Sequence, residues 1–425
     1  MKVFFDMIGC RLNQSEIEHL AIQFKAMGHE IVAEADEADL AIVNTCAVTV
    51  KAAADSRKKL RRAGRLGSPK VIATGCWATL YPEEALRLAG VTDVVSNTDK
   101  DTIPFLLFGD EAGKITAADL VRAPLPGDRA RTRAFIKVQE GCDNHCTYCL
   151  TRLARGKSRS RAVKAIKQDI AAARAGGAKE IVITGVQLGA WGRDLANPKT
   201  LKDLISTLLA SDEISRLRLS SIEPWDFDLE MLELWRDERM CRHLHIPLQS
   251  GSDRILKWMG RPITTSQYAL LVARARERIP DVAITTDVIV GFPGETEEDF
   301  IETEQFVCKM GFAGGHVFTY SPRPGTAAFK LTNRVPGEQA RTRNAALRKI
   351  FNESGRAFRD QFLNLQMAVL WESSERLENG TWRLSGLTDN YIRIYAEADE
   401  DLWNEISNVK MISQHGVRSA LIGKL

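Results

Sequence analysis

This sequence of 425 residues is short of the features that mark membrane, secreted and strongly charged proteins. No uninterrupted apolar run approaches the roughly 20 residues of a membrane-spanning helix, so we expect no membrane segment. The opening MKVFFDMIGC turns polar at Arg11, before it reaches the length of the apolar region in a secretion signal. Neither charge dominates, because 58 basic and 55 acidic residues leave a formal net charge of +3. We therefore expect an ordinary globular protein of the cytoplasm.

The eight cysteines point to metal sites, because a reducing cytoplasm does not favour disulfides. Cys142, Cys146 and Cys149 lie in GCDNHCTYC with the spacing C-x3-C-x2-C. Thiolates at this spacing can hold an iron–sulfur cluster, and three thiolates for four irons leave one iron open to a small molecule. Zinc is the alternative, with His145 as a conceivable ligand. Structural zinc takes four protein ligands, however, and no obvious fourth is close in the sequence.

Three more cysteines each follow a short apolar run: Cys10 ends VFFDMIGC, Cys46 ends LAIVNTC and Cys76 ends VIATGC. Such runs are typical of buried parallel strands, and helical stretches follow them. Because loops after parallel strands gather at one edge of a sheet, we expect these thiols to converge. Any one of them could be a small buried hydrophobe instead. Glycine before two of them, Gly9 and Gly75, favours a second three-thiolate cluster.

Changes in pattern along the chain predict an α/β protein with three domains. Strands alternating with helices predict a parallel sheet over 1–120, and the Pro-, Gly- and Arg-containing segment 121–133 is typical of a linker. Six strand–helix repeats over 134–364 predict a partial (βα)6 barrel. Short alternating segments with aromatics and turn residues predict a small β-barrel over 365–425. The six strands expected in the larger barrel are Phe135–Gln139, Glu180–Val186, Arg216–Ile222, His243–Gln249, Ala283–Phe292 and Gly315–Ser321.

Polar residues and glycines cluster where the strands of the larger barrel are expected to end. Sites of such barrels lie at the carboxyl ends of the strands, which is where the cysteine loop also opens. Ordinary loop chemistry could explain any one of these positions, but together they favour a pocket for a bulky polar cofactor. The candidates for cofactor contacts are Tyr148, Gly185, Gln187, Ser220, Glu223, Gln249 and Gly291.

Two runs of basic residues interrupt an otherwise balanced charge distribution. Runs of this kind are usually solvated faces, but two of them near the proposed cluster sites suggest contact with nucleic-acid phosphates. The first run contains Arg57, Lys58, Lys59, Arg61, Arg62 and Arg65, and the second contains Arg152, Arg155, Lys157, Arg159, Arg161 and Lys164.

Motifs along essentially the whole chain resemble those of the radical S-adenosylmethionine methylthiotransferases. The matching segments are GCRLNQSE, VNTCAVT, TGCWA, EGCDNHCTYC, LARGKSRSR, TGVQLG, HIPLQSGSDRILKWMGR, GFPGETEEDF and YSPRPGTAA. The resemblance implies a transferase with an amino-terminal three-cysteine domain, a radical barrel and a terminal TRAM β-barrel. It also implies that Cys142, Cys146 and Cys149 hold a radical [4Fe-4S] cluster that binds S-adenosylmethionine. By the same resemblance Cys10, Cys46 and Cys76 hold an auxiliary [4Fe-4S] cluster.

Within this family, TGVQLGAWGRDL and LARGKSRSR are most similar to the branch that acts on N6-threonylcarbamoyladenosine. The implied reaction is methylthiolation of carbon 2 of that base at position 37, in the anticodon loop of tRNA. A sulfur donor and an electron donor of the flavodoxin or ferredoxin type are implied as well, and no motif identifies them. The isopentenyladenosine branch is the rival, whereas QSGS argues against the branch that modifies a ribosomal protein. A non-catalytic RNA-binding or electron-transfer iron–sulfur protein is the alternative from another class.

One segment departs from the family pattern. Members commonly have a proline-containing segment after the third cysteine of the radical motif, whereas this chain has LTRLARG. The threonylcarbamoyl group carries a carboxylate, so we expect a basic side chain in the substrate pocket to bind it. Arg152 and Arg155, both in this segment, are the candidates for that contact.

Overall fold

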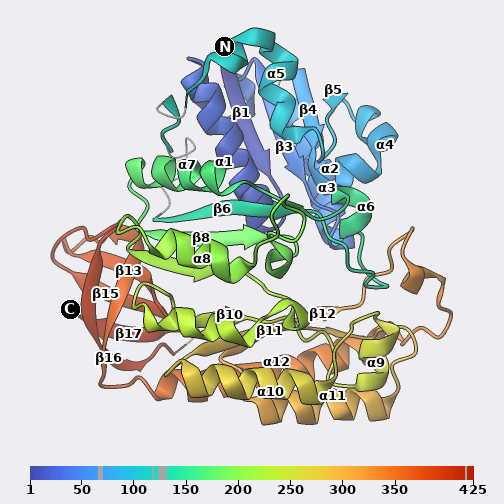
Figure 1. The fold of residues 1–425 in the computed structure, drawn as a ribbon, viewed down its shortest axis with the longest axis vertical. Coiled ribbons are helices and arrows are strands. Elements are labelled where there is room, and N and C mark those ends of the chain that lie inside the picture. Colours follow the sequence, from blue (N-terminus) through green and yellow to red (C-terminus); the bar gives the residue numbers. More distant parts are fainter. Residues whose placement is uncertain (66–69, 117–118, 123–131, 417–418) are drawn as a thin grey trace. The chain divides into compact units, whose positions relative to one another are not determined.

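The computed structural model describes residues 1–65, 70–116, 119–122, 132–416 and 419–425 (Figure 1). Most of the predicted linker, at 123–131, lies outside the described residues. The chain forms two compact units, each of which gathers segments that are distant in sequence. The first unit contains Met1–Asn144, Cys149–Gln187 and Trp191–Pro198, and the second contains His145–Tyr148, Leu188–Ala190 and Lys199–Leu425.

A five-stranded parallel sheet forms the amino-terminal part of the first unit, as the sequence predicts (Figure 1). Its strand order is β2-β1-β3-β4-β5. Every residue of β3 is buried, which explains why its first four residues, LAIV, are all apolar. The strands are β1 (Lys2–Met7), β2 (Glu30–Val32), β3 (Leu40–Thr45), β4 (Lys70–Thr74) and β5 (Val91–Val94). The three-residue β2 was not predicted, because so short a run carries no periodic signal.

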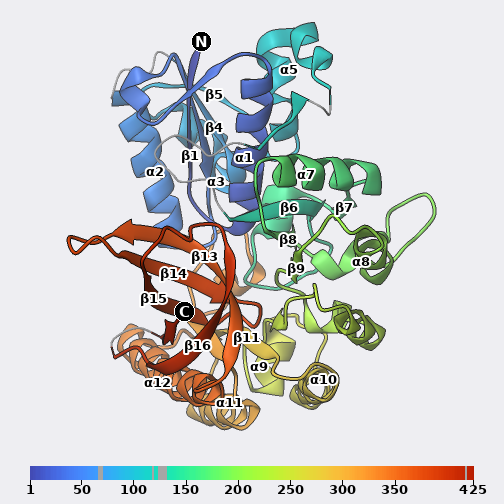
Figure 2. The same cartoon turned by 90° about the vertical axis from the view of Figure 1, so that its left-hand side faces the viewer.

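Helices α1 (Arg11–Ala26) and α2 (Val50–Arg65) cover opposite faces of this sheet (Figure 2). Under α1, Leu20 and Phe24 pack against Val3 and Phe5 of β1 in one apolar cluster. Under α2, Leu60 belongs to a second cluster with side chains of β3 and β4. Shorter helices complete the segment: α3 (Gly75–Leu80), α4 (Pro82–Leu86), α5 (Ile103–Phe108), η1 (Ala35–Glu37), η2 (Lys100–Thr102) and η3 (Gly109–Lys114).

The first unit also contains the first repeats of the predicted larger barrel. β6 (Arg133–Glu140) pairs in parallel with β8 (Glu180–Gly185), and the two-residue β7 (Arg159–Ser160) pairs antiparallel with β6. The short helix α6 (Thr151–Arg155) lies directly after Cys149, and α7 (Val163–Ala175) joins β7 to β8. The radical motif therefore occupies the loop after β6, as the sequence predicts.

The second unit contains the remaining strands of that barrel and its helices. β10 (His243–His245), β11 (Ala283–Val290) and β12 (Gly314–Thr319) form a parallel sheet, and Ser221 after β9 (Arg216–Leu219) bridges to His245. All six predicted strands are thus present; β6 ends one residue later than predicted, and the other five end earlier, most of all β10, which ends at His245 and not at Gln249. The helices are α8 (Leu201–Leu209), α9 (Asp253–Trp258), α10 (Thr265–Arg278), α11 (Glu297–Met310), α12 (Gly337–Asp360), η5 (Leu188–Ala190), η6 (Pro224–Asp226), η7 (Leu229–Arg236) and η8 (Ala327–Lys330). In the part of the chain that is described, no helix is both long and apolar enough to cross a membrane.

The carboxy-terminal strands close into a barrel of order β13-β14-β15-β17-β16, which confirms the predicted small β-barrel (Figure 2). Trp371 and Val369 lie in its core, and the Trp371 indole N–H donates to Ser407 Oγ at 2.7 Å. Arg218 of β9 ties this barrel to the rest of the unit by donating to the carbonyl oxygens of Thr388 and Asp389. The strands are β13 (Gln366–Arg376), β14 (Trp382–Thr388), β15 (Arg393–Ala398), β16 (Ile406–Gln414) and β17 (Leu421–Lys424).

The tight junction between β4 and α3 yields the first prediction. Gly75 has φ +91°, and a Cβ there would lie 2.3 Å from the carbonyl oxygen of Thr45. Gly28 has a similar φ of +81°, but a Cβ there would meet no atom within 4 Å. We expect Gly28→Ala to lower the free energy of unfolding by about 1–2 kcal/mol through backbone strain alone. Gly75→Ala adds steric overlap and should cost about 2–5 kcal/mol in total.

Chemical denaturation followed by circular dichroism measures both variants. Because both glycines adopt a positive φ, the difference between them isolates the steric contribution at the end of β4. Equal losses in the two variants would show that the contact between Gly75 and Thr45 does not restrict this junction.

Candidate metal and cofactor sites

The first candidate site lies at the carboxyl edge of the amino-terminal sheet. Cys10 follows β1, Cys46 follows β3 and Cys76 lies in α3 directly after β4. These three strands are neighbours and run parallel, so their carboxyl ends share one edge. Besides burial, negative charge on Cys76 and Cys10 contributes to raising the pKa of the Cys46 thiol, so both thiols lie near it. The fold therefore brings together the three thiols that the sequence singled out.

Gly9 and Gly75 allow the loops to close around these thiols. Gly9 has φ +122°, and a Cβ there would lie 2.9 Å from Cys46 Sγ. At Gly75 the approach is closer still, because a Cβ there would lie 2.3 Å from the carbonyl oxygen of Thr45 at the end of β3. Any larger side chain at these positions would push the cysteine loops apart, which explains glycine before Cys10 and Cys76.

Burial shapes the chemistry of Cys46. Burial raises the pKa of its thiol to about 11, although the backbone N–H of Val48, 3.5 Å from Sγ, opposes the shift. A buried thiol of this kind stays protonated at neutral pH unless a metal takes the place of the proton. Three thiols on one edge, one of them needing a metal to ionise, fit the donor set of an iron–sulfur cluster.

Arg155 lies beside these thiols and not in a substrate pocket, which corrects the prediction made for it. Its side chain is only 2% exposed. Nε donates to Cys76 Sγ at 3.3 Å, Nη1 donates to Glu16 and Glu140, and Nη2 donates to Asn13 and again to Glu16. All five N–H groups of a guanidinium are accounted for by these contacts, so none is left to bind a substrate carboxylate.

Glu16 is the centre of this buried network. Burial alone would raise the pKa of its carboxyl group, but Arg155, Lys100 and Lys137 hold that pKa well below its ordinary value. Lys100 Nζ donates to Glu16 at 2.6 Å and to Asn44 at 3.3 Å. Sequence reasoning missed Glu16 as a site residue. Its signal was its position in GCRLNQSE, three residues after Asn13 on the helix that follows Cys10, which puts both side chains on one face.

The radical motif is divided between the two units, with Cys142 and Cys149 in the first and Cys146 in the second. In the first unit, the amide of Cys142 donates to Gly156 O at 3.1 Å, and Cys149 Sγ lies 3.1 Å from Thr151 Oγ1. Gln187 accepts from the amide of Asp143 at 3.0 Å, so its side chain shapes the loop just after Cys142. Gly185, the residue two before it, ends β8.

In the second unit, Arg261 organises the side chains near Cys146. Arg261 is buried, and its Nη2 donates to Glu223 at 2.8 Å and to Pro247 O at 2.6 Å. Its Nη1 lies 3.4 Å from the hydroxyl of Tyr148, and its guanidinium lies 4.6 Å from the centre of the Trp225 ring. Arg261 thus connects two predicted cofactor residues, Tyr148 and Glu223. It is the last residue of the motif HIPLQSGSDRILKWMGR and was not among the predicted site residues.

The other predicted cofactor residues of the second unit lie at or near strand ends. Gln249 has φ +72° and exchanges backbone hydrogen bonds with Asp287 and Ile289 of β11. Gly291 also has a positive φ, and its amide donates to the buried carboxylate of Glu295. The buried atoms Ser220 Oγ and Asp287 Oδ1 have no hydrogen-bond partner among the described residues. Buried polar atoms of this kind fit a polar cofactor that would complete their hydrogen bonds.

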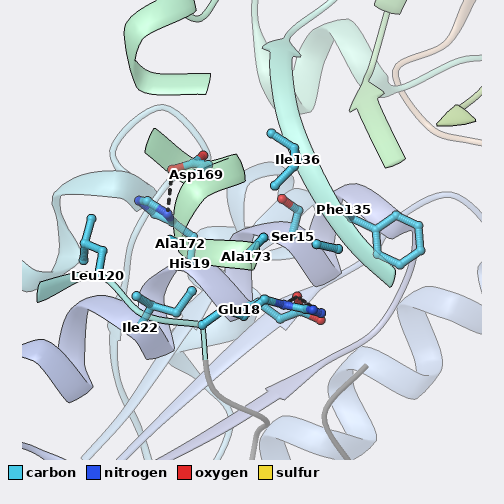
Figure 3. Close-up of a pocket in the computed structure, with 12 residues that line it drawn as sticks. Ser15, Glu18, His19, Ile22, Leu120, Phe135, Ile136, Asp169, Ala172 and Ala173 are labelled. Carbon is cyan, nitrogen blue, oxygen red and sulfur yellow. Dashed lines mark hydrogen bonds and ion pairs between the residues drawn. The ribbon is translucent and has the colours of Figure 1, made fainter. Parts of the chain in front are cut away.

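A cavity of about 30 Å³ opens in the first unit between α1, α7 and β6 (Figure 3). His19 and Asp169 pair across it at 3.7 Å, and Arg122 pairs with Glu18 at 2.9 Å. Burial lowers the pKa of His19, although the charge of Asp169 opposes the shift. The volume suits water and not a cofactor, and none of the predicted site residues lines it.

No three His, Cys, Asp or Glu side chains in the described ranges are spaced to hold a single metal ion. An iron–sulfur cluster does not require its ligands to converge on one atom, because each thiolate binds a different iron.

Comparisons with known proteins place the chain among radical enzymes that modify tRNA. Residues 136–307 match the family model described as radical SAM superfamily, and residues 2–97 match that of uncharacterized protein family UPF0004. A threonylcarbamoyladenosine tRNA methylthiotransferase MtaB of Bacillus subtilis is 34% identical over 96% of this chain and 93% of its own length. A tRNA-2-methylthio-N(6)-dimethylallyladenosine synthase of Acetivibrio thermocellus is 32% identical over 95% of this chain and 87% of its own.

The fold has a relative among solved structures as well. A radical S-adenosylmethionine methyltransferase, TsrM, of Kitasatospora setae superposes with a TM-score of 0.58 at 16% identity, over 77% of each chain. That similarity supports the fold alone, whereas the sequence matches extend over nearly the whole chain. The chain belongs to the radical S-adenosylmethionine methylthiotransferase family.

Proposed function

We propose that this protein methylthiolates carbon 2 of N6-threonylcarbamoyladenosine in the anticodon loop of tRNA. The observation that carries the proposal is the presence of two separate three-cysteine sets, one of them gathered at the edge of the amino-terminal sheet. The family match and the similarity to the Bacillus subtilis enzyme support the same reaction. Cys142, Cys146 and Cys149 would hold the radical cluster, and Cys10, Cys46 and Cys76 the auxiliary one.

When bound, S-adenosylmethionine and the two [4Fe-4S] clusters supply the radical, the methyl group and the sulfur, which acid–base groups cannot supply to an unactivated aromatic carbon. The chain orients these groups. Gln187 fixes the loop after Cys142, and Arg261 fixes Tyr148 and Glu223. Gln187 and Arg261 are themselves buried, which limits their movement, and positioning a reactive centre requires such rigidity.

Arg152 remains the candidate for recognising the threonyl carboxylate. Its side chain is half-buried, lies in α6 and approaches the backbone of Asp143 at 3.4 Å. A base in the anticodon loop is easier to present to a pocket than a base stacked in a duplex. We further propose that the chain is organised as an amino-terminal domain (1–120), a radical barrel (134–364) and a TRAM-like barrel (365–425).

The two cysteine sets have different expected roles, which gives the second prediction. Anaerobically reconstituted protein should hold about eight irons, and replacing Cys142, Cys146 and Cys149 by alanine should leave about four and abolish S-adenosylmethionine cleavage. Replacing Cys10, Cys46 and Cys76 should leave about four irons and measurable 5′-deoxyadenosine, with no methylthiolated RNA. Iron analysis and chromatography of the products measure both variants. A folded auxiliary-site variant that still thiolates RNA would contradict the assignment.

The third prediction tests the substrate. Purified enzyme should convert tRNA that carries N6-threonylcarbamoyladenosine, and should leave tRNA that carries N6-isopentenyladenosine unchanged. Arg152→Met should reduce the first reaction by at least tenfold, because a lost charged hydrogen bond costs about 1.5–3 kcal/mol. Cleavage of S-adenosylmethionine should fall much less. Nucleoside mass spectrometry measures the products, and turnover of the isopentenyl tRNA alone would assign the chain to the rival branch.

The structure separates the basic residues of α2 into two groups. Arg57 lies over the Trp77 ring at 5.7 Å, Lys59 forms an ion pair with Asp6, and Arg62, although exposed, lies 3.5 Å from a carboxylate oxygen of Glu34. The side chains of Lys58, Arg61 and Arg65 are exposed. These three lie three, four and seven residues apart, which is the spacing of one helix face. We propose that this face contacts tRNA phosphates.

Salt dependence of tRNA binding supplies the fourth prediction. Replacing Lys58, Arg61 and Arg65 together by glutamine should lower the slope of log Kd against log salt by about 2–3, because each phosphate contact contributes about 0.7–0.9. The matched control replaces Arg341, Arg348 and Lys349, three exposed cations of α12, and should leave the slope unchanged. An equal decrease of the slope in both variants would mean that the overall charge of the protein, and not the face of α2, determines the salt dependence of tRNA binding.

A further inference from the structure

A guanidinium group contacts one of the auxiliary thiols. Nε of Arg155 lies 3.3 Å from Sγ of Cys76, within hydrogen-bonding distance for a sulfur acceptor. The two residues are 79 positions apart in sequence, and Arg155 ends α6, the short helix that follows the last cysteine of the radical motif. The contact is therefore a product of the fold of the first unit and not of local sequence.

The surroundings of Arg155 keep this contact in place. Glu16 accepts from both Nη atoms, and Glu140 and Asn13 accept the remaining two N–H groups. Rotating the guanidinium to release the sulfur would break several buried, charge-assisted hydrogen bonds at once. The Nε–H group is thus aimed at Cys76 by a network that is complete without any substrate.

We infer that Arg155 is a positioning residue for the auxiliary cluster: its Nε–H donates to the sulfur of Cys76 and raises the reduction potential of the cluster bound there. Hydrogen bonds to ligating sulfurs are among the protein's means of setting the potential of such clusters. A donor stabilises negative charge on the sulfur, and the reduced cluster carries more of that charge. The inference rests on the proposed function only for the presence of a cluster at Cys10, Cys46 and Cys76.

Two charge-conserving substitutions separate the hydrogen bond from the charge. Arg155→Lys keeps a cation beside Glu16 but cannot place an N–H at the position of Nε. Lys137→Arg is the matched control, since Lys137 belongs to the same network and pairs with Asp101, Glu140 and Glu16. Both substitutions are made in the full-length chain with Cys142, Cys146 and Cys149 replaced by alanine, so that only the auxiliary cluster is observed.

The measurement is a redox titration followed by electron paramagnetic resonance. Arg155→Lys should shift the midpoint to a more negative potential at an unchanged iron content of about four per chain, and Lys137→Arg should leave the midpoint in place. An unshifted midpoint in Arg155→Lys would overturn the inference. If the parent chain binds no cluster, the proposed function fails instead, so the two failures are distinguishable.

A second measurement does not depend on the stability of the variant. In parent protein whose arginines carry ¹⁵N only in the guanidinium group, the reduced auxiliary cluster should show a hyperfine coupling to ¹⁵N, which the Arg155→Lys protein should lack. A parent protein without this coupling would overturn the inference even if Arg155→Lys failed to hold its cluster.

Discussion

The buried pairing of Glu16 with Arg155 is the interaction on which the geometry of the first unit depends. A carboxylate that is fully buried is costly unless cations surround it, and here Arg155 and Lys100 lie within 2.7 Å of its oxygens. Removing one partner of such a pair typically costs about 3–5 kcal/mol, because the other charge is left buried without compensation. The pair joins α1, which follows Cys10, to α6, which follows Cys149.

The network also explains how one short helix serves two purposes. α6 contains five residues, too few to be stable as an isolated helix, so its conformation depends on what its side chains contact. Arg155 fixes it to Cys76, while Arg152 at its other end approaches the backbone of Asp143 in the loop after Cys142. The segment is held firmly through Arg155.

The basic residues of α2 have two different roles. Arg57 packs on an aromatic ring and Lys59 pairs with Asp6, so both stabilise the fold of the sheet and its helix. Lys58, Arg61 and Arg65 point to solvent, where three like charges close together oppose folding slightly. A bound polyanion would neutralise the repulsion between these three charges, which is consistent with a tRNA substrate.

The sequence by itself determined the fold class, the six barrel strands and the convergence of Cys10, Cys46 and Cys76. It could do so because apolar runs mark buried strands, and parallel strands place the loops that follow them at one edge. It also located the radical motif after β6, since the spacing of its cysteines is a local property. It did not reveal β16, whose alternating pattern is weak, or the boundaries of the two compact units.

Tertiary structure decided what each charged side chain does. Arg152 and Arg155 are three residues apart and looked equivalent in the sequence, but only Arg155 is buried against Glu16 and Cys76. Glu16 and Arg261 lie in motifs that the sequence analysis quoted, but nothing in those motifs identified their partners, and Lys100 lies in none of them, because an ion pair between residues far apart in the chain produces no periodic pattern in the sequence. Burial, which sets the cost of a charge and the partners it must find, is a property of the folded chain and cannot be assigned to a residue from its neighbours in sequence.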